Sequence, residues 1–149
     1  AGQAMGNATA TCPGAAGPAY DSFGSMYEEE YGNAAIAFTE QTYDASAVTR
    51  RANAAAGEND GPAVRDAMQS VANPGGTEVT IDNLAEGIEM AANGEEVQYS
   101  GASSAVDFDD QGDLQAGTYE IWEFDDSDAG INRLDLTSVG QDQALEPGN

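Results

Sequence analysis

Residues 97–124, VQYSGASSAVDFDDQGDLQAGTYEIWEF, mark the point at which the periodicity of the chain changes from helical to extended. Residues 118–124 alternate between apolar and polar side chains, which is typical of a β-strand with one buried face. Residues 97–99 and 105–108 alternate in the same way and predict two short strands. The Asp- and Gly-rich segment 109–113 predicts a turn before the long strand.

Upstream of this stretch the apolar residues recur at three- and four-residue spacing, which predicts helices. The predicted helices begin at Pro18, near Phe38, at Pro62 and at Asp82 or Asn83, and they end at Gly32, Gly57, Asn73 and Gly94. Val79, Thr80 and Ile81 are expected to lead into the fourth helix. Residues 1–17 are small, polar and rich in Gly and Pro, so they predict a loop with one short strand near Met5.

Downstream, residues 125–130 predict a turn and residues 131–136 a last strand. Residues 138–149 predict a flexible tail. Four helices followed by strands, without a repeated βαβ pattern, predict an incomplete α/β protein.

The charge of the chain is strongly one-sided. It contains 27 acidic residues, four arginines and no lysine, for a net charge of −23. Disorder is the alternative at such a charge, but 40% hydrophobic residues and clear periodic segments predict a folded protein with an acidic surface. An acidic surface repels itself in dilute buffer, and concentrated salt screens that repulsion. The alternative is an acidic protein from an organism that does not need salt, but the absence of lysine favours a salt-loving organism, such as a halophilic archaeon. A nucleic-acid partner is not expected, since binding phosphates requires clustered Lys and Arg.

The composition also excludes most catalytic chemistry. Without histidine or lysine the chain has no Ser-His-Asp triad, no imidazole base, no Schiff base and no P-loop lysine. One cysteine, Cys12, cannot form a thiolate metal site alone. Carboxylate pairs remain as acid/base candidates, but among 27 acids such pairs occur by chance. We therefore expect a protein that is not an enzyme, with no catalytic residues, no metal and no cofactor.

Two short motifs have both a functional and a structural interpretation. Residues 107–113 place oxygen-bearing side chains and a glycine as in a calcium loop, but Thr118 occupies the position of the expected glutamate. A tight turn between strands is therefore the favoured interpretation. Asn7-Ala8-Thr9 is a glycosylation sequon, which matters only if the protein is secreted.

Three blocks of the chain, in order, resemble the C-terminal part of type I periplasmic-binding proteins, especially the leucine/isoleucine/valine receptors of ABC importers. The blocks are GPAY…F…Y…YG…F..QTYDA within residues 17–45, AAG…AVRDAM..VANPGG within residues 55–76, and YSGASSAVDFD..GD…YEIW within residues 99–122. The order and spacing of the blocks make the resemblance specific.

The resemblance implies two α/β lobes joined by a hinge, with an amino acid clamped between them and no covalent chemistry. Residues 1–137 would be the C-terminal portion of this domain: an incomplete C-terminal lobe with crossover segments and terminal β-hairpins. The chain would then be less than half of a receptor. Its expected partners are a small amino-acid ligand and a membrane permease. Its expected location is extracellular at the cell surface, with any anchor in the missing N-terminal part.

The resemblance also implies a position for the ligand. At the position of Phe38, family members place a side chain that faces the cleft, and Gln41, Tyr43 and Asp44 lie at the same helix start, beside Glu40. An aromatic ring and polar groups at a helix N-terminus suit a zwitterionic ligand. The alternative is that Phe38 and Tyr43 belong to the core and that Asp44 is only a helix-start charge.

The second function hypothesis is a structural one. If 149 residues are the whole product, the clamp is missing, and exposed strand edges would require self-association, as in a self-assembling or filament-type protein. Arg50 and Arg51 lie where the family tends to be apolar, and in this hypothesis they serve as a contact surface.

Overall fold

The computed structural model describes residues 8–124 and 131–140. The sequon residue Asn7, Met5 and the predicted turn at 125–130 lie outside these ranges. Within these ranges, four α-helices and five strands follow in the order β1, α1, α2, α3, β2, α4, β3, β4, β5, with a 3₁₀ turn after α3.

All four predicted helices are confirmed. They are α1 (Tyr20–Tyr31), α2 (Thr39–Ala56), α3 (Gly61–Ala67), which continues into the 3₁₀ turn Gln69–Val71, and α4 (Leu84–Ala92). Gly32 and Gly57 end α1 and α2 in the left-handed conformation, with φ of 73° and 69°. The Asp60 side chain caps α3 by accepting a hydrogen bond from the amide of Ala63.

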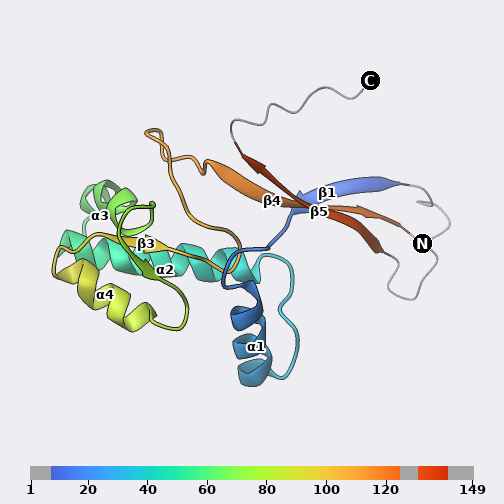
Figure 1. Cartoon of the computed structure of the whole chain (residues 1–149), viewed down its shortest axis with the longest axis horizontal. Coiled ribbons are helices and arrows are strands. Elements are labelled where there is room, and N and C mark those ends of the chain that lie inside the picture. Colours follow the sequence, from blue (N-terminus) through green and yellow to red (C-terminus); the bar gives the residue numbers. More distant parts are fainter. Residues whose placement is uncertain (1–7, 125–130, 141–149) are drawn as a thin grey trace.

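Strands β1 (Thr9–Pro13), β4 (Ala116–Glu123) and β5 (Asn132–Gly140) form an antiparallel sheet in the order β1-β4-β5. It extends away from the helices (Figure 1). The predicted long strand is confirmed in β4. The loop prediction is wrong for residues 9–13, because the polar segment TATCP forms a strand by pairing with β4 rather than by any alternation of its own.

Strand β5 also exceeds its predicted length. It continues through Ser138, Val139 and Gly140, which pair with Thr118, Gly117 and Ala116. These three residues are part of the range in which a tail is expected. For residues 141–149, which the structure does not describe, the tail stays a prediction.

A second, two-stranded parallel sheet joins β2 (Thr77–Val79) to β3 (Val97–Tyr99). The strand β3 was predicted, whereas β2 was expected as the lead-in to a helix. The difference arises because Val79 is fully buried beside β3 and under α4. A side chain at Gly87 of α4 would come within 2.5 Å of Val79, so the glycine permits this close packing.

The strand predicted at 105–108 is wrong, because the segment contributes only isolated bridges, from Ala105 to Ser100 and from Phe108 to Leu114. The turn predicted at 109–113 is confirmed. The Asp109 carboxylate accepts hydrogen bonds from the amides of Gln111 and Asp113, at 2.8 and 2.9 Å.

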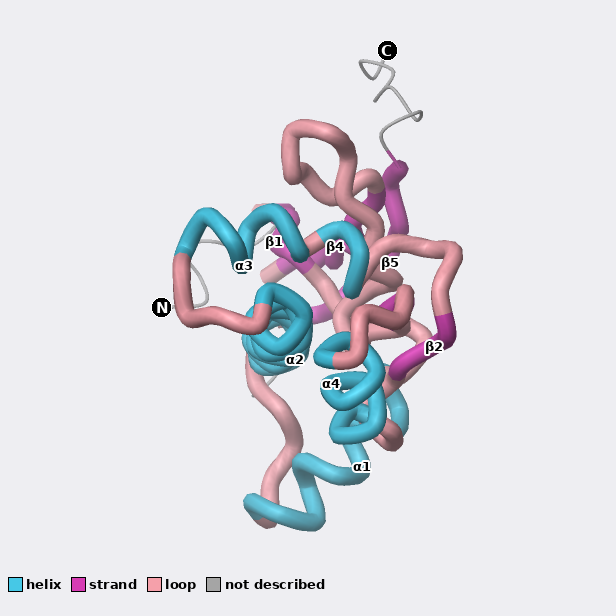
Figure 2. The backbone as a smooth tube through the Cα atoms, turned by 90° about the vertical axis from the view of Figure 1, so that its left-hand side faces the viewer, coloured by secondary structure: helices cyan, strands magenta, loops and turns pink. Residues whose placement is uncertain are grey.

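Helix α2 is the centre of the core, with α3 and α4 packed along it (Figure 2). The buried apolar residues around it are Ala47, Val48, Ala52, Val71, Ala72, Val79, Ala91, Val97, Tyr99 and Val106. A smaller cluster of Ala19, Phe23, Ile81 and Ala102 fixes α1 against the same layer. None of the described helices is long and apolar enough to cross a bilayer.

Candidate ligand-binding site

The first residue before α2, Phe38, is the one described residue other than glycine with a positive φ, at 69°. A left-handed backbone is unfavourable for a bulky side chain. Burial does not compensate for this, because 52% of Phe38 is exposed. Strained backbone that core packing does not explain is characteristic of functional sites.

Local hydrogen bonds fix Phe38 in this conformation. Thr39 donates from its hydroxyl and its amide to the carbonyl of Ile36, at 2.7 and 3.1 Å. Thr42 donates in the same two ways to the carbonyl of Phe38, at 2.8 and 3.0 Å. The two threonines therefore hold the aromatic ring in solvent at the start of α2.

Phe38 lies at the edge of a groove between α1 and α2, with a volume of about 820 Å³. This volume falls in the range of roughly 300–1,000 Å³ that is usual for small-molecule sites. The groove is lined by Phe23, Met26, Tyr27, Glu29, Glu30, Tyr31, Ile36, Ala37, Phe38, Thr39, Thr42, Tyr43, Ser46, Ala47, Arg50 and Leu84. Most of these side chains are apolar or aromatic, and few are charged.

Aromatic rings form a continuous series along the groove. The ring centroids of Tyr43 and Phe23 are 5.1 Å apart, those of Phe23 and Tyr27 are 5.9 Å apart, and those of Tyr27 and Tyr31 are 4.6 Å apart. Burial, and then the charge of Asp44, raises the pKa of the Tyr43 hydroxyl. The groove therefore offers an uncharged, largely apolar wall next to Phe38.

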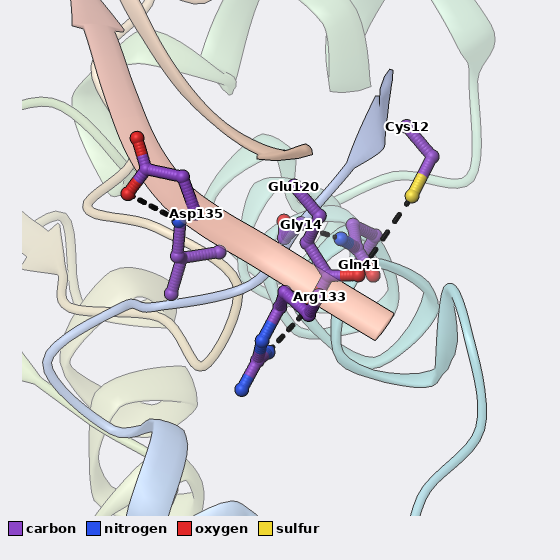
Figure 3. A network of polar contacts seen from close by, with 7 residues as sticks. Cys12, Gly14, Gln41, Glu120, Arg133 and Asp135 are labelled. Atoms are coloured by element: carbon purple, nitrogen blue, oxygen red, sulfur yellow. Dashed lines mark hydrogen bonds and ion pairs between the residues drawn. The ribbon is translucent and has the colours of Figure 1, made fainter. Parts of the chain in front are cut away.

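Gln41 faces a different part of the molecule. Its amide nitrogen donates to the carbonyl of Gly14 at 2.8 Å, which ties the end of β1 to α2 (Figure 3). Its amide oxygen is buried without a hydrogen-bond partner among the described residues. Gln41 lines a second, shallower hollow of about 990 Å³, which also includes Phe38.

Asp44 points into the protein and is only 4% exposed. One carboxylate oxygen accepts from the Tyr99 hydroxyl and the Ala102 amide, each at 2.9 Å. The other accepts from the amide and the hydroxyl of Ser103, at 2.7 and 2.6 Å. With four donors satisfied inside the chain, Asp44 fastens the loop after β3 to α2 and does not line the groove.

The structure thus separates the expected site residues. Phe38 and Tyr43 lie together in the groove, Gln41 lies in the neighbouring hollow, and Asp44 lies on the buried side of α2. Glu40 is also buried, at 8% exposure.

Arg50 and Arg51 also differ in exposure. Arg51 is fully buried, with its guanidinium 4.1 Å from the centroid of the Tyr99 ring, so it is not available as a contact surface. Its three guanidinium nitrogens have no hydrogen-bond acceptor within the part of the chain that the structure describes. Burial lowers its pKa to about 10. Arg50 is exposed and lines the groove.

The spacing of these residues along α2 indicates which of them share a face of the helix. Asp44 and Arg51 are seven residues apart, about two turns, and therefore share a face of α2. Arg50 is four residues after Ser46 and eight after Thr42, so it shares their face instead. Within residues 8–124 and 131–140, no group of acidic or cysteine side chains is arranged to hold a metal ion.

A family model described as the receptor family ligand binding region matches residues 3–127. The chain belongs to this receptor family. The match confirms the family expected from the three sequence blocks, and it indicates binding rather than catalysis as the class of function.

The fold of this receptor-family chain is similar to the crystal structure of the leucine binding protein LivK from Thermotoga maritima, with a TM-score of 0.58 and 19% sequence identity. The match covers 95% of this chain and 33% of that protein, so the chain spans about a third of the length of the structure it resembles. The predicted partial α/β fold of type I periplasmic-binding proteins is confirmed. No curated protein matches the chain.

Proposed function

We propose that this chain is the C-terminal portion of a solute receptor that captures a branched-chain or similar apolar amino acid outside the cell. The receptor would deliver its ligand to the membrane permease of an ABC importer. Membership of a ligand-binding receptor family supports the proposal, as does the similarity to a leucine binding protein.

The single observation that carries the proposal is the exposed Phe38 ring beside an apolar groove. Its backbone is left-handed, at φ 69°, which is unfavourable for a bulky residue. Strain of this kind is found mainly at positions that serve a function other than packing. An aromatic surface with few polar groups matches an aliphatic side chain.

The test is the thermal unfolding of the intact polypeptide, in concentrated salt, with increasing leucine, isoleucine or valine. Ligand that binds only the folded state raises stability by about 2.7 kcal/mol at a hundred times its Kd. We expect the unfolding temperature to rise with at least one of these amino acids. No rise with any apolar amino acid would contradict the proposal.

The informative variant is Phe38→Gly, because glycine adopts a left-handed backbone without strain. We expect this variant to be more stable than the wild type by about 1 kcal/mol and to lose most of the leucine response. Loss of binding in a stabilised protein cannot result from unfolding. Unchanged binding would remove Phe38 from the site.

The acidic surface supports a working environment of high salt. The chain has a net charge of −23, so its carboxylates repel one another. This repulsion weakens as the Debye length falls to roughly 3 Å at 1 M salt. We expect the unfolding temperature without ligand to rise steadily from dilute buffer to multimolar KCl. A temperature independent of salt would argue against a halophilic protein.

Self-association is a second candidate, which one observation favours. Strand β5 is at an edge of its sheet, and its Leu134 and Leu136 are exposed by 49% and 38%, as is Ile131 just before the strand by 54%. Long apolar edge strands invite pairing with another chain. Sedimentation over a range of concentrations decides the matter: oligomers that Leu134→Lys disperses would support it, and a monomer at all concentrations would exclude it.

A further inference from the structure

The groove has one firmly packed wall and one weakly packed wall. Helix α2 is the centre of the helical layer, whereas α1 packs much less extensively on the other helices and projects from the layer (Figure 1). In α1, all of which the structure describes, only Phe23 in the first turn is buried, and Tyr31 in the last turn is 64% exposed. The spacing between the two walls is therefore fixed near the start of α1.

The loop at 101–103 holds the start of α1. The amide of Ala19, the residue before the helix, donates to the carbonyl of Gly101 at 3.1 Å. The amide of Gly17 donates to the carbonyl of Ala102 at 3.0 Å. A side chain at Gly17 would overlap the Gly101 carbonyl, so the two segments meet backbone to backbone. The position of α1 thus follows the position of this loop.

The other side of the same loop is bound to α2 by Asp44. Its carboxylate accepts hydrogen bonds from the amide of Ala102 at 2.9 Å and from the amide and hydroxyl of Ser103 at 2.7 and 2.6 Å. A side chain at Gly101 would come within 2.5 Å of this carboxylate, so α2 and the loop are in close contact. The loop therefore lies as a spacer between α2 and the start of α1.

We propose that Asp44 and Ser103 are positioning residues of the groove, which set the spacing between α1 and α2 through the loop at 101–103. The proposal rests on the solute-binding function and adds how the site is held ready for its ligand. Neither residue touches the ligand. A protein that adopts other groove widths part of the time binds its ligand more weakly, in proportion to the time it spends away from the competent width.

Ser103→Ala tests this role, with Ser100→Ala as the matched control. Ser103→Ala removes the hydroxyl bond to Asp44 and keeps both amide bonds, so we expect the variant to fold. Ser100 is buried to the same extent, and its hydroxyl also donates to a carboxylate, that of Glu78 on β2. A loss of stability that both variants share is therefore not an effect on the groove.

The first measurement needs no ligand. Spin labels at Glu28→Cys on α1 and Thr49→Cys on α2, in a Cys12→Ser background, report the distance between the two walls from exposed positions outside the groove lining. We expect Ser103→Ala to broaden the distribution of this distance and Ser100→Ala to leave it as in the labelled parent. A distribution that Ser103→Ala leaves unchanged would overturn the proposal.

The second measurement is calorimetric titration with leucine. We expect Ser103→Ala to weaken leucine binding about threefold, because the competent width is less populated, and Ser100→Ala to leave it unchanged. Saturating leucine should restore the narrow distance distribution of Ser103→Ala, since the bound state selects one width.

The failure of the positioning role is distinguishable from the failure of the solute-binding function. If leucine binds Ser103→Ala and Ser100→Ala with equal affinity, the solute-binding function stands and the positioning role is wrong. If leucine does not bind the wild type, both fail.

Discussion

Arg50 and Arg51 are adjacent in sequence and chemically identical, yet they lie in opposite environments. Arg50 is exposed at the edge of an open groove, whereas Arg51 is fully buried over the ring of Tyr99. The 100° turn between successive helical residues produces this difference. A charged residue in this chain therefore has to be interpreted by the face of α2 on which it lies.

Asp44 and Phe38, two of the expected site residues, show the same contrast between a buried and an exposed position. Asp44, on the inner face, is 4% exposed and satisfied by four donors, while Phe38, at the outer side, is 52% exposed and strained. The inner face uses polar groups to fix the fold, and the outer face leaves an apolar group available. Three predictions test this division, from the largest expected effect to the smallest.

Asp44→Ala should have the largest effect. It removes the acceptor of four hydrogen bonds and leaves buried donors on Tyr99, Ala102 and Ser103. We expect a loss of about 3–5 kcal/mol in the free energy of unfolding, since each unsatisfied buried group is costly. Denaturant unfolding measures it, with the exposed Glu89→Ala as the control. A loss no larger than that of the control would contradict a structural role for Asp44.

Tyr99→Phe should lower stability by about 1.5 kcal/mol at neutral pH, because it removes one hydrogen bond to a carboxylate. The effect should shrink in alkali. Burial, and then Asp44, raises the pKa of Tyr99 above its ordinary 10.0, so above this pH the unfolded chain loses a proton that the folded chain retains. Wild-type stability therefore falls as pH rises above 10. The variant should fall less steeply, and parallel curves would contradict the assignment.

Arg51→Met should have the smallest effect and the opposite sign. Methionine preserves apolar volume and removes three buried nitrogens that have no acceptor among the described residues, so we expect a gain of about 1 kcal/mol. Arg50→Met, on the exposed side, should change stability by less than about 0.5 kcal/mol. A clear loss for Arg51→Met would mean that the stacking on Tyr99 outweighs the unsatisfied donors.

The pH profile of Arg51→Met gives an independent check. The folded pKa of Arg51 is about 10, below the ordinary 12.5, so between these values the unfolded chain holds the proton that the folded chain has released. Arg51 therefore adds stability as pH rises through this window, opposite to Tyr99. Without Arg51, the alkaline decline should be steeper than in the wild type.

Local patterns were sufficient to predict the helices and the long strand. Helix ends at Gly32 and Gly57 and the alternation in β4 are properties of neighbouring residues. Strands β1 and β2 were missed because their conformation depends on distant partners, which are Tyr119 to Glu123 for β1 and Val97 to Tyr99 for β2. The sequence of a short segment does not identify the distant strand with which it pairs.

The expected site was only partly assembled by the sequence. Phe38 and Tyr43 were expected at one helix start and both line one groove, and their role in ligand binding stays a prediction. The sequence does not show which way Asp44 points, because its donors come from residues 99–103.

The central claim is that ligand binds on the outer side of α2 and not on its inner side. Titrating ¹⁵N-labelled protein with leucine and following its amide and arginine side-chain resonances tests this claim most directly. The account predicts shifts at Phe38, Thr42, Tyr43 and the Arg50 side chain, with Tyr99, Ala102 and Ser103 unchanged. Shifts centred on the loop at 100–104, with the Arg50 resonance unmoved, would contradict it.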